Sequence, residues 1–505
     1  MFAARTRLSD IQRSSRLLDA AAMLLFAVVL AALSWRLYEH RPTDVVSLDR
    51  WALASYRDVV YFPLVALGDA VNPYDSVRDG DPERYMERYP VADHLPLYSP
   101  LTLLVFAPLA ALPVEASMMA FAALNAALFV LLAWTAIRVT GRQTTVAVVF
   151  GVSAFLLASQ PGRGAFNAGQ LSVPLALAMV GALQWGDRRG WRSAALVAIS
   201  TMKPTFGGPF GVFLAARRDW RSASIGLAIG AVAFIGGMIA IFAWTGELSV
   251  SAVAEVVAGN HTHLSHDPEA VPTTNKARTD LPAVYEYLTQ QPVPRGVSVA
   301  IAAAIAAITV GALWRARYSR DAETAASPAS ALIIVAIFIC IFHNVYDLLL
   351  LVVPLAACVS AADEQWKRMP TACRRWIIVL LLTPFVNIFW TRGFGLLAER
   401  AGLPWGENAG AVIGGAYRLS CAANGLALGA VWCILVVSLL LGSRSSETDL
   451  FQRLRQRDTD DDSWAHEYFQ RNSTRNHRTI DNKSSNEVPA SPSKSNDDQS
   501  TVVSQ

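Results

Sequence analysis

Long apolar runs separated by short polar segments dominate the chain. The first extends from Leu17 to about Leu37, long enough to cross a bilayer, which takes about 20 apolar residues. Further runs lie at about 98–112, 115–137, 143–158, 170–185, 193–215, 222–244, 297–314, 329–342, 348–360, 376–390 and 412–442. The pattern predicts an all-α polytopic integral membrane protein with about twelve transmembrane helices.

Charge between the runs predicts their orientation. Residues 1–16 carry four arginines, which predict a cytoplasmic N-terminus. Counting spans from there puts two large polar loops, about 39–97 and 245–296, outside, and the basic segments 315–323 and 361–375 inside. The same count places the arginines between 188 and 192 outside, against the positive-inside rule. Re-entrant pieces around 159–170 or 200–206 could restore the rule.

The apolar pattern stops after residue 442. Residues 443–505 are rich in Ser, Asn, Asp and Arg, and they cannot bury enough apolar surface to offset their ordering entropy. The sequence therefore predicts a cytoplasmic N-terminus at 1–16, a multi-pass membrane domain at 17–442 and a disordered cytoplasmic tail at 443–505.

Composition agrees with a chain immersed in lipid. Charged residues make up 16% of the sequence, against roughly 25% in soluble proteins. The net charge of +3 excludes a strongly basic nucleic-acid binder as the default. The five cysteines form no CxxC pair, so neither a zinc site nor a disulfide framework is indicated. His261, His263 and His266 have metal-like spacing, but they lie in a polar loop without a supporting frame, and we expect no metal.

Polar residues at membrane depth are costly and tend to be functional. Four places stand out along the chain. They are the segment from Tyr56 through Asp58 and Tyr61 to Asn72, the segment Asn167–Gln170, the pair Lys203-Pro204, and the cluster His343-Asn344-Val345-Tyr346-Asp347.

Taken together, these motifs resemble glycosyltransferase family 87, membrane enzymes of the GT-C fold that use polyprenyl-phosphate sugars. The resemblance covers roughly residues 17–360. It rests on the order of Asp58, Asn72-Pro73-Tyr74, Pro100-Leu101, Pro108-Leu109-Ala110-Ala111-Leu112-Pro113, Gly169-Gln170, Lys203-Pro204 and His343-Asn344-Val345-Tyr346-Asp347, with Ser99 where the family usually has proline.

The resemblance implies a GT-C-like fold and transfer of a sugar, most commonly mannose, to a glycolipid or glycan on the extracytoplasmic face of the cell membrane. It implies that Asp58 is the catalytic base. Donor phosphate or sugar would be bound by His343, Lys203, Gln170, Tyr61, Asn72, Tyr346 and Asp347. The donor is a lipid-linked substrate, so no cofactor is expected, and the absence of a nucleotide-binding loop motif agrees with this.

Each assignment has a plainer alternative. Asp58 could form a solvated loop ion pair with Arg57 or Arg88, which contributes little. His343 could be a satisfied core histidine, with Asp347 fixing its tautomer. Lys203 could snorkel from a helix end, and Gln170 could be a plain amide at a helix start.

Two other classes of function remain open at this point. A transporter or lipid flippase predicts inverted repeats and polar groups near the bilayer midplane, and neither is evident in the sequence. A non-catalytic partner in envelope assembly would tolerate loss of Asp58. The sugar, the acceptor, the oligomeric state and the role of the tail are not encoded in any motif that we recognise.

Overall fold

The computed structural model describes residues 2–41, 52–74, 88–89, 98–252, 254–255, 278–316, 324–387, 393, 396 and 415–441, with side chains from residue 14 onward. The predicted tail and large parts of both predicted outside loops lie outside these residues. Within them the regular structure is helical, and a single β-bridge joins Arg278 and Asn344.

In chain order, the helices within the described residues begin with one long element, and long and short ones follow it. They are α1 (Phe2–Glu39), α2 (Ala54–Tyr56), η1 (Arg57–Tyr61), α3 (Phe62–Gly68), α6 (Pro100–Ala110), α7 (Val114–Arg138), α8 (Val146–Ala158), α9 (Gln160–Ala168), α10 (Ser172–Trp185), η2 (Gly186–Arg189), α11 (Gly190–Ser200), α12 (Pro204–Ala216), α13 (Trp220–Trp244), α15 (Leu281–Thr289), α16 (Arg295–Ala316), α17 (Pro328–Cys340), η4 (Val345–Leu351), α18 (Val352–Ser360), α19 (Glu364–Arg368), α20 (Thr371–Val386) and the helix Gly415–Leu441.

Among the described residues, five helices are long and apolar enough to cross a membrane. They are Ser14–Glu39 of α1, α7, α13, α16 and Gly415–Leu441, with 22 to 27 residues each. At 1.5 Å per residue they measure roughly 33–40 Å, more than the ~30 Å hydrocarbon core. This architecture fits a polytopic membrane protein. The count of about twelve spans stays a prediction, because the remaining apolar helices are shorter.

The shorter helices form a second set inside the bundle. The helices α10, α11, α12 and α17 have 14, 11, 13 and 13 residues, or roughly 17–21 Å. The run predicted as one element at 193–215 is two helices, interrupted at 201–203. Proline disfavours helical backbone in the residue before it, and Lys203 is indeed extended immediately before Pro204.

A second break separates α8 from α9, whose axes are bent by 75°. Ser159 caps α9 by accepting a hydrogen bond from the Gly162 amide at 3.1 Å, and Pro161 occupies the first turn, as expected at helix starts. A Cβ on Gly162 would lie 1.7 Å from the Leu156 carbonyl oxygen, so only glycine fits. Helix breaks therefore occur in both segments where the sequence allows re-entrant pieces.

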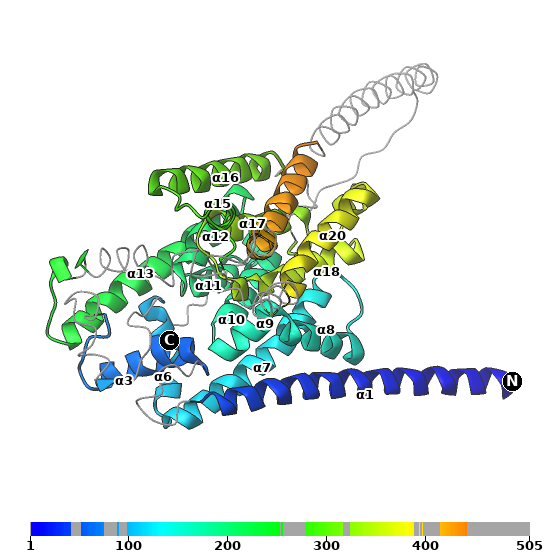
Figure 1. Ribbon diagram of the computed structural model, residues 1–505, viewed down its shortest axis with the longest axis horizontal. Coiled ribbons are helices and arrows are strands. Elements are labelled where there is room, and N and C mark those ends of the chain that lie inside the picture. The colour runs from blue at the N-terminus through cyan, green and yellow to red at the C-terminus, as the bar shows by residue number, and fades with distance from the viewer. Residues whose placement is uncertain are drawn as a thin grey trace, which may run out of the picture. The chain divides into compact units, whose positions relative to one another are not determined.

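The two arginine-rich turns lie at the same end of the bundle. The Asp187 carboxylate accepts hydrogen bonds from the amides of Ser222 at 2.7 Å and Arg221 at 3.2 Å. Arg217 donates to the Leu183 carbonyl oxygen at 2.9 Å. We call this end the basic end (turns 186–192 and 217–221). The pair α11–α12 therefore leaves the basic end and returns to it, packed against α13 (Figure 1).

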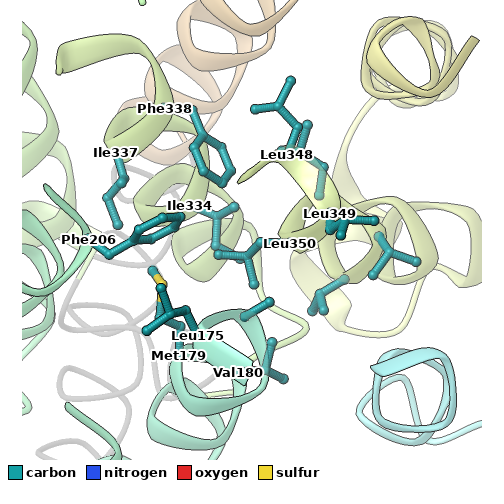
Figure 2. Packing of buried hydrophobic residues seen from close by; sticks show 14 of the residues in the cluster. Leu175, Met179, Val180, Phe206, Ile334, Ile337, Phe338, Leu348, Leu349 and Leu350 are labelled. Atoms are coloured by element: carbon teal, nitrogen blue, oxygen red, sulfur yellow. The ribbon is translucent and has the colours of Figure 1, made fainter. Parts of the chain in front are cut away.

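Aliphatic and aromatic side chains fill the centre of the bundle. Figure 2 shows α10, α12, α17 and η4 contributing to one packed cluster. Its labelled members are Leu175, Met179, Val180, Phe206, Ile334, Ile337, Phe338, Leu348, Leu349 and Leu350. Meanwhile α1 runs along the edge of the bundle against α8 (Figure 1), and it exposes large apolar side chains such as Leu17 and Leu24, as a lipid-facing helix does.

We expect Gly162→Ala to prevent correct folding, because the added methyl group collides with backbone at the α8–α9 bend. Gly151→Ala in α8 is the matched control, since a Cβ there meets nothing within 4 Å. Monodisperse yield and melting temperature in detergent report the outcome. Equal behaviour of the two variants would contradict the role assigned to Gly162.

The positive-inside rule predicts that the basic end faces the cytoplasm. In a background with the five native cysteines replaced, Arg188→Cys and Arg218→Cys should be shielded from an impermeant thiol reagent applied outside. Val250→Cys should react, because this residue is 90% exposed and follows α13 at its other end. Outside labelling of the Arg188→Cys variant, with protection of the Val250→Cys variant, would reverse the orientation.

Candidate functional site

A buried carboxylate, Asp347, joins three segments of the chain. Its Oδ2 accepts a hydrogen bond from Lys203 Nζ at 2.7 Å and lies 3.0 Å from His343 Nδ1. Its Oδ1 accepts from the Ser172 hydroxyl at 2.8 Å. The Asp347 side chain has no solvent exposure, and that of Lys203 is 13% exposed. This arrangement meets the requirement that a buried charge be paired and hydrogen-bonded.

Interruptions between helices bring these side chains together around Asp347. Lys203 ends the interruption between α11 and α12, Ser172 begins α10, and Asp347 lies in η4 just beyond α17. The loop that carries His343 is held by Thr279, whose amide donates to the His343 carbonyl oxygen at 2.9 Å. Non-helical backbone at membrane depth is tolerated where protein or a water-filled cavity surrounds it.

His343 is held in an aromatic setting. Its ring meets Phe206 edge-on at 4.5 Å and Phe338 at 5.3 Å between centroids. Its Nδ1 faces Asp347, which makes Asp347 the orienting partner that the sequence offers as an alternative. Its Nε2 is buried and has no hydrogen-bond partner among the described residues. A buried polar atom left in this state requires an explanation, and a bound ligand is one.

Lys203 points into the protein. Besides the Asp347 carboxylate, its ammonium lies 5.2 Å from the ring centroid of Phe206 and 5.3 Å from that of Tyr346, within cation–π range. The side chain is thus an interior one, not a snorkelling lysine. Tyr346 is fixed in turn by Asn344, whose amide donates to the tyrosine oxygen at 2.9 Å.

Gln170, two residues before Ser172, connects the turn before α10 to the first predicted loop. The Tyr98 hydroxyl donates to Gln170 Oε1 at 2.7 Å, and Gln170 Nε2 donates to the Ser55 hydroxyl. The amide of Leu53 donates to the Asn167 carbonyl oxygen at 2.7 Å. Gly169 has φ +70°, and a Cβ there would lie 2.8 Å from Tyr56 Cβ. The segment before Asp58 is therefore packed closely on the Asn167–Gln170 turn.

Asp58 lies in η1, a π-helical turn, and is buried with its neighbour. Its Oδ1 accepts from Arg57 Nε at 2.7 Å, and the two side chains are only 1% and 2% exposed. The pairing with Arg57 agrees with the plainer alternative, but the pair is buried instead of solvated. Arg88 pairs with Asp69 at 3.3 Å. Turns of π-helix are frequently found at functional sites.

The two remaining predicted residues make contacts away from the Asp347 cluster. Tyr61 donates from its hydroxyl to the Leu112 carbonyl oxygen at 3.0 Å. Asn72 Oδ1 accepts from the Tyr74 amide at 3.0 Å, and its Nδ2 lies 3.4 Å from Glu247. Both contacts shape the backbone around η1 and α3, and the proposed substrate roles of Tyr61 and Asn72 stay predictions.

Several residues of the site have no motif that announces them. Ser172, Phe206 and Phe338 fall inside apolar runs and look like core positions. Arg57 is visible beside Asp58, but its burial is not. Ser55 has no signal at all. For metals, the described residues hold no group of three or more His, Cys, Asp or Glu side chains suited to an ion, and the histidines between 261 and 266 lie outside the described residues.

The fold and this cluster define a class: a helical membrane protein with a charged site at interrupted helices. The family model of glycosyltransferase family 87 matches residues 97–354, more than half of the chain, and the chain belongs to that family. It is therefore a membrane glycosyltransferase, as its motifs predict, with a sugar donor and an acceptor as its substrates. The matched range includes Gln170, Lys203 and His343 but begins after Asp58. No curated protein and no solved structure matches the chain.

We expect Asp347→Asn to destabilise the protein by about 3–5 kcal/mol, because it leaves the Lys203 ammonium buried without its counter-charge. Adding Lys203→Met to Asp347→Asn should restore part of that loss. Glu364→Gln is the control, since the exposed pair of Glu364 with Lys367 contributes little. Thermal unfolding in detergent measures all three. Equal unfolding of Asp347→Asn and the wild type would show that the cluster is not a stabilising one.

Proposed function

We propose that this glycosyltransferase moves a hexose, mannose as the first candidate, from a polyprenyl-phosphate donor to a glycolipid or glycan acceptor by inverting single displacement. Asp58 is the base. Its burial beside Arg57, in a turn packed on the Asn167–Gln170 segment, is the observation that carries the proposal. The family supports the reaction class, and the buried pair supports the choice of residue.

The proposed reaction balances without a cofactor. The acceptor oxygen forms a bond to the anomeric carbon, and its proton passes to Asp58. The bond from the anomeric carbon to the phosphate oxygen breaks, and its electron pair leaves with polyprenyl phosphate. Attack opposite the leaving group inverts the anomeric centre, as in inverting glycosidases. The lipid-linked sugar is a substrate, and its phosphate is already a good leaving group.

The buried setting of Asp58 suits a base. Arg57 donates to Asp58 from both Nε and Nη2, which fixes the carboxylate that receives the proton of the acceptor hydroxyl. The Arg57 guanidinium balances the charge of the Asp58 carboxylate inside the protein. The π-helical turn that carries Asp58 restricts the direction of its side chain. A positioned general base contributes typically 10²–10⁴-fold to rate.

Lys203 and His343 suit the donor phosphate, whose negative charge grows as the bond to the sugar breaks. Lysine binds phosphate as a point charge, and the buried His343 Nε2 lacks a hydrogen-bond partner among the described residues. Preorganised groups of this kind stabilise developing charge most effectively in water-poor sites. Asp347 holds both side chains in place, Tyr346 borders Lys203, and Gln170 contacts the sugar.

The proposed site faces away from the cytoplasm. The helices α10, α11, α12 and α17 run from the basic end to the level of Lys203 and His343, a path of roughly 17–21 Å. In a hydrocarbon core of ~30 Å, that path ends nearer the opposite leaflet. With the basic end inside, substrates reach the site from the extracytoplasmic side, and both termini of the membrane domain are cytoplasmic.

The proposal is tested with membranes that contain the wild type or Asp58→Asn, supplied with labelled polyprenyl-phosphate mannose. We expect label in a new lipid or glycan with the wild type, and a rate lower by about 10²–10⁴-fold with Asp58→Asn. Asp69→Asn is the matched control, because Asp69 is a half-exposed carboxylate in the same segment, paired with Arg88.

The possible outcomes test the enzyme class and the role of Asp58 separately. Equal transfer by the wild type and Asp58→Asn would keep the enzyme class and remove Asp58 as the base. Absence of transfer with labelled polyprenyl-phosphate mannose and arabinose alike, across a broad acceptor extract, would reject the donor class and favour a transport or assembly role.

A further inference from the structure

The loop that carries His343 is attached to a segment of the second predicted outside loop. The Thr279 amide and hydroxyl both donate to the His343 carbonyl oxygen, at 2.9 and 3.2 Å. Arg278 forms an antiparallel β-bridge with Asn344, and its guanidinium carbon lies 5.0 Å from the ring centroid of Phe342. Two adjacent residues therefore contact three consecutive positions of the loop.

The segment that makes these contacts, which we call the clamp (Arg278, Thr279 and Asp280), is itself fixed. The Asp280 carboxylate accepts from the Arg278 guanidinium at 2.8 Å and from the Ala283 amide at 3.1 Å, so Asp280 also caps α15. The Arg278 amide donates to the Tyr287 hydroxyl, further along α15, at 3.1 Å. Thr279 and Asp280 are 0% and 1% exposed. The clamp and α15 thus form one buried, hydrogen-bonded unit.

The helix Gly415–Leu441 packs against this unit. Side chains from α15 and from this helix form one buried apolar cluster, whose members are Ala283, Val284, Tyr287, Cys421 and Ala422. A Cβ on Gly425 would lie 2.7 Å from the Thr279 carbonyl oxygen and would collide with the Val284 side chain. Glycine at position 425 therefore allows the helix to approach the backbone of the clamp.

We propose that the clamp, supported by the helix at Gly425, positions His343 for the donor phosphate. This inference rests on the proposed function, in which His343 Nε2 binds that phosphate. The clamp fixes the backbone of His343, and Asp347 faces its Nδ1 at 3.0 Å. Of the ring nitrogens, Nε2 alone is left without a partner in the described part of the chain. Thr279 is in this role a positioning residue, because it acts through His343.

The position of His343 matters most in the transition state. Negative charge grows on the phosphate as its bond to the sugar breaks, so a hydrogen bond from Nε2 is stronger there than in the ground state. A displacement of about 1 Å can cost about 10²-fold in rate. Loss of a contact made mainly in the transition state lowers kcat and leaves KM nearly unchanged. A displaced clamp is therefore expected to act on kcat.

The first test displaces the clamp with Gly425→Ala. Gly429→Ala, one turn further along the same helix, is the matched control, because a Cβ there approaches Leu281 Cδ2 at 3.4 Å. The full chain in membranes receives labelled polyprenyl-phosphate mannose. We expect Gly425→Ala to lower kcat by roughly 10–100-fold at a nearly constant donor KM, and Gly429→Ala to match the wild type. An unchanged kcat for Gly425→Ala overturns the support by the helix.

The second test decides even where Gly425→Ala lowers the folded yield. Thr279→Val removes the hydroxyl donor, and Thr279→Ser keeps it. We expect Thr279→Val to lower kcat by roughly 3–10-fold, as for one hydrogen bond, and Thr279→Ser to restore it. His343→Asn keeps an amide close to Asp347 but removes Nε2. In that background Thr279→Val should cost nothing further, because residues that act through one group are not additive.

The results distinguish this inference from the proposed function. An unchanged kcat for Thr279→Val, or equal fractional losses in the wild-type and His343→Asn backgrounds, overturns the clamp alone, since equal losses indicate a merely structural role. Wild-type kcat in His343→Asn overturns the phosphate contact of His343 and this inference with it. Absence of transfer by the wild type overturns the donor class and the inference together.

Discussion

The Asp347 carboxylate is the interaction on which the arrangement of the site depends. It receives Lys203, His343 and Ser172, which belong to the α11–α12 interruption, the loop after α17 and the start of α10. None of these segments is continuous helix, so each leaves backbone groups that must be satisfied inside the protein. One buried charge therefore decides where three helix ends meet, and the ion pair with Lys203 makes its burial tolerable.

Much of the architecture follows from sequence because lipid imposes simple rules. Apolar length identifies α7, α13 and α16 closely, and Lys203-Pro204 marks a real interruption. The return of α11–α12 to its starting end could not be derived, since hydropathy records whether a segment is apolar and not which way it runs. The contacts of Asp187 with the turn at 217–221 supply that direction.

The candidate site, like the fold, could be predicted only in part. The motif residues Lys203, His343, Tyr346 and Asp347 are brought together by the fold, whereas Gln170 bonds Tyr98 and Ser55. The sequence does not show which charged side chains are exposed to solvent and which are buried. Asp58 and Arg57 look like a loop pair because they fall in the predicted outside loop at about 39–97, yet the fold buries both. Burial is a property of neighbours distant in sequence, and it changes a weak surface pair into a constrained one.

The apolar cluster of Figure 2 has a consequence for energetics across the membrane. Between the basic end and the Asp347 level the protein is filled with side chains such as Leu175, Ile334 and Leu349, which carry neither ions nor protons. Under the proposed reaction, donor, acceptor, products and the released proton all enter and leave on one side of this apolar cluster. Turnover then moves no net charge through the membrane field, and the transfer reaction can neither consume nor dissipate the electrochemical gradient of the cell.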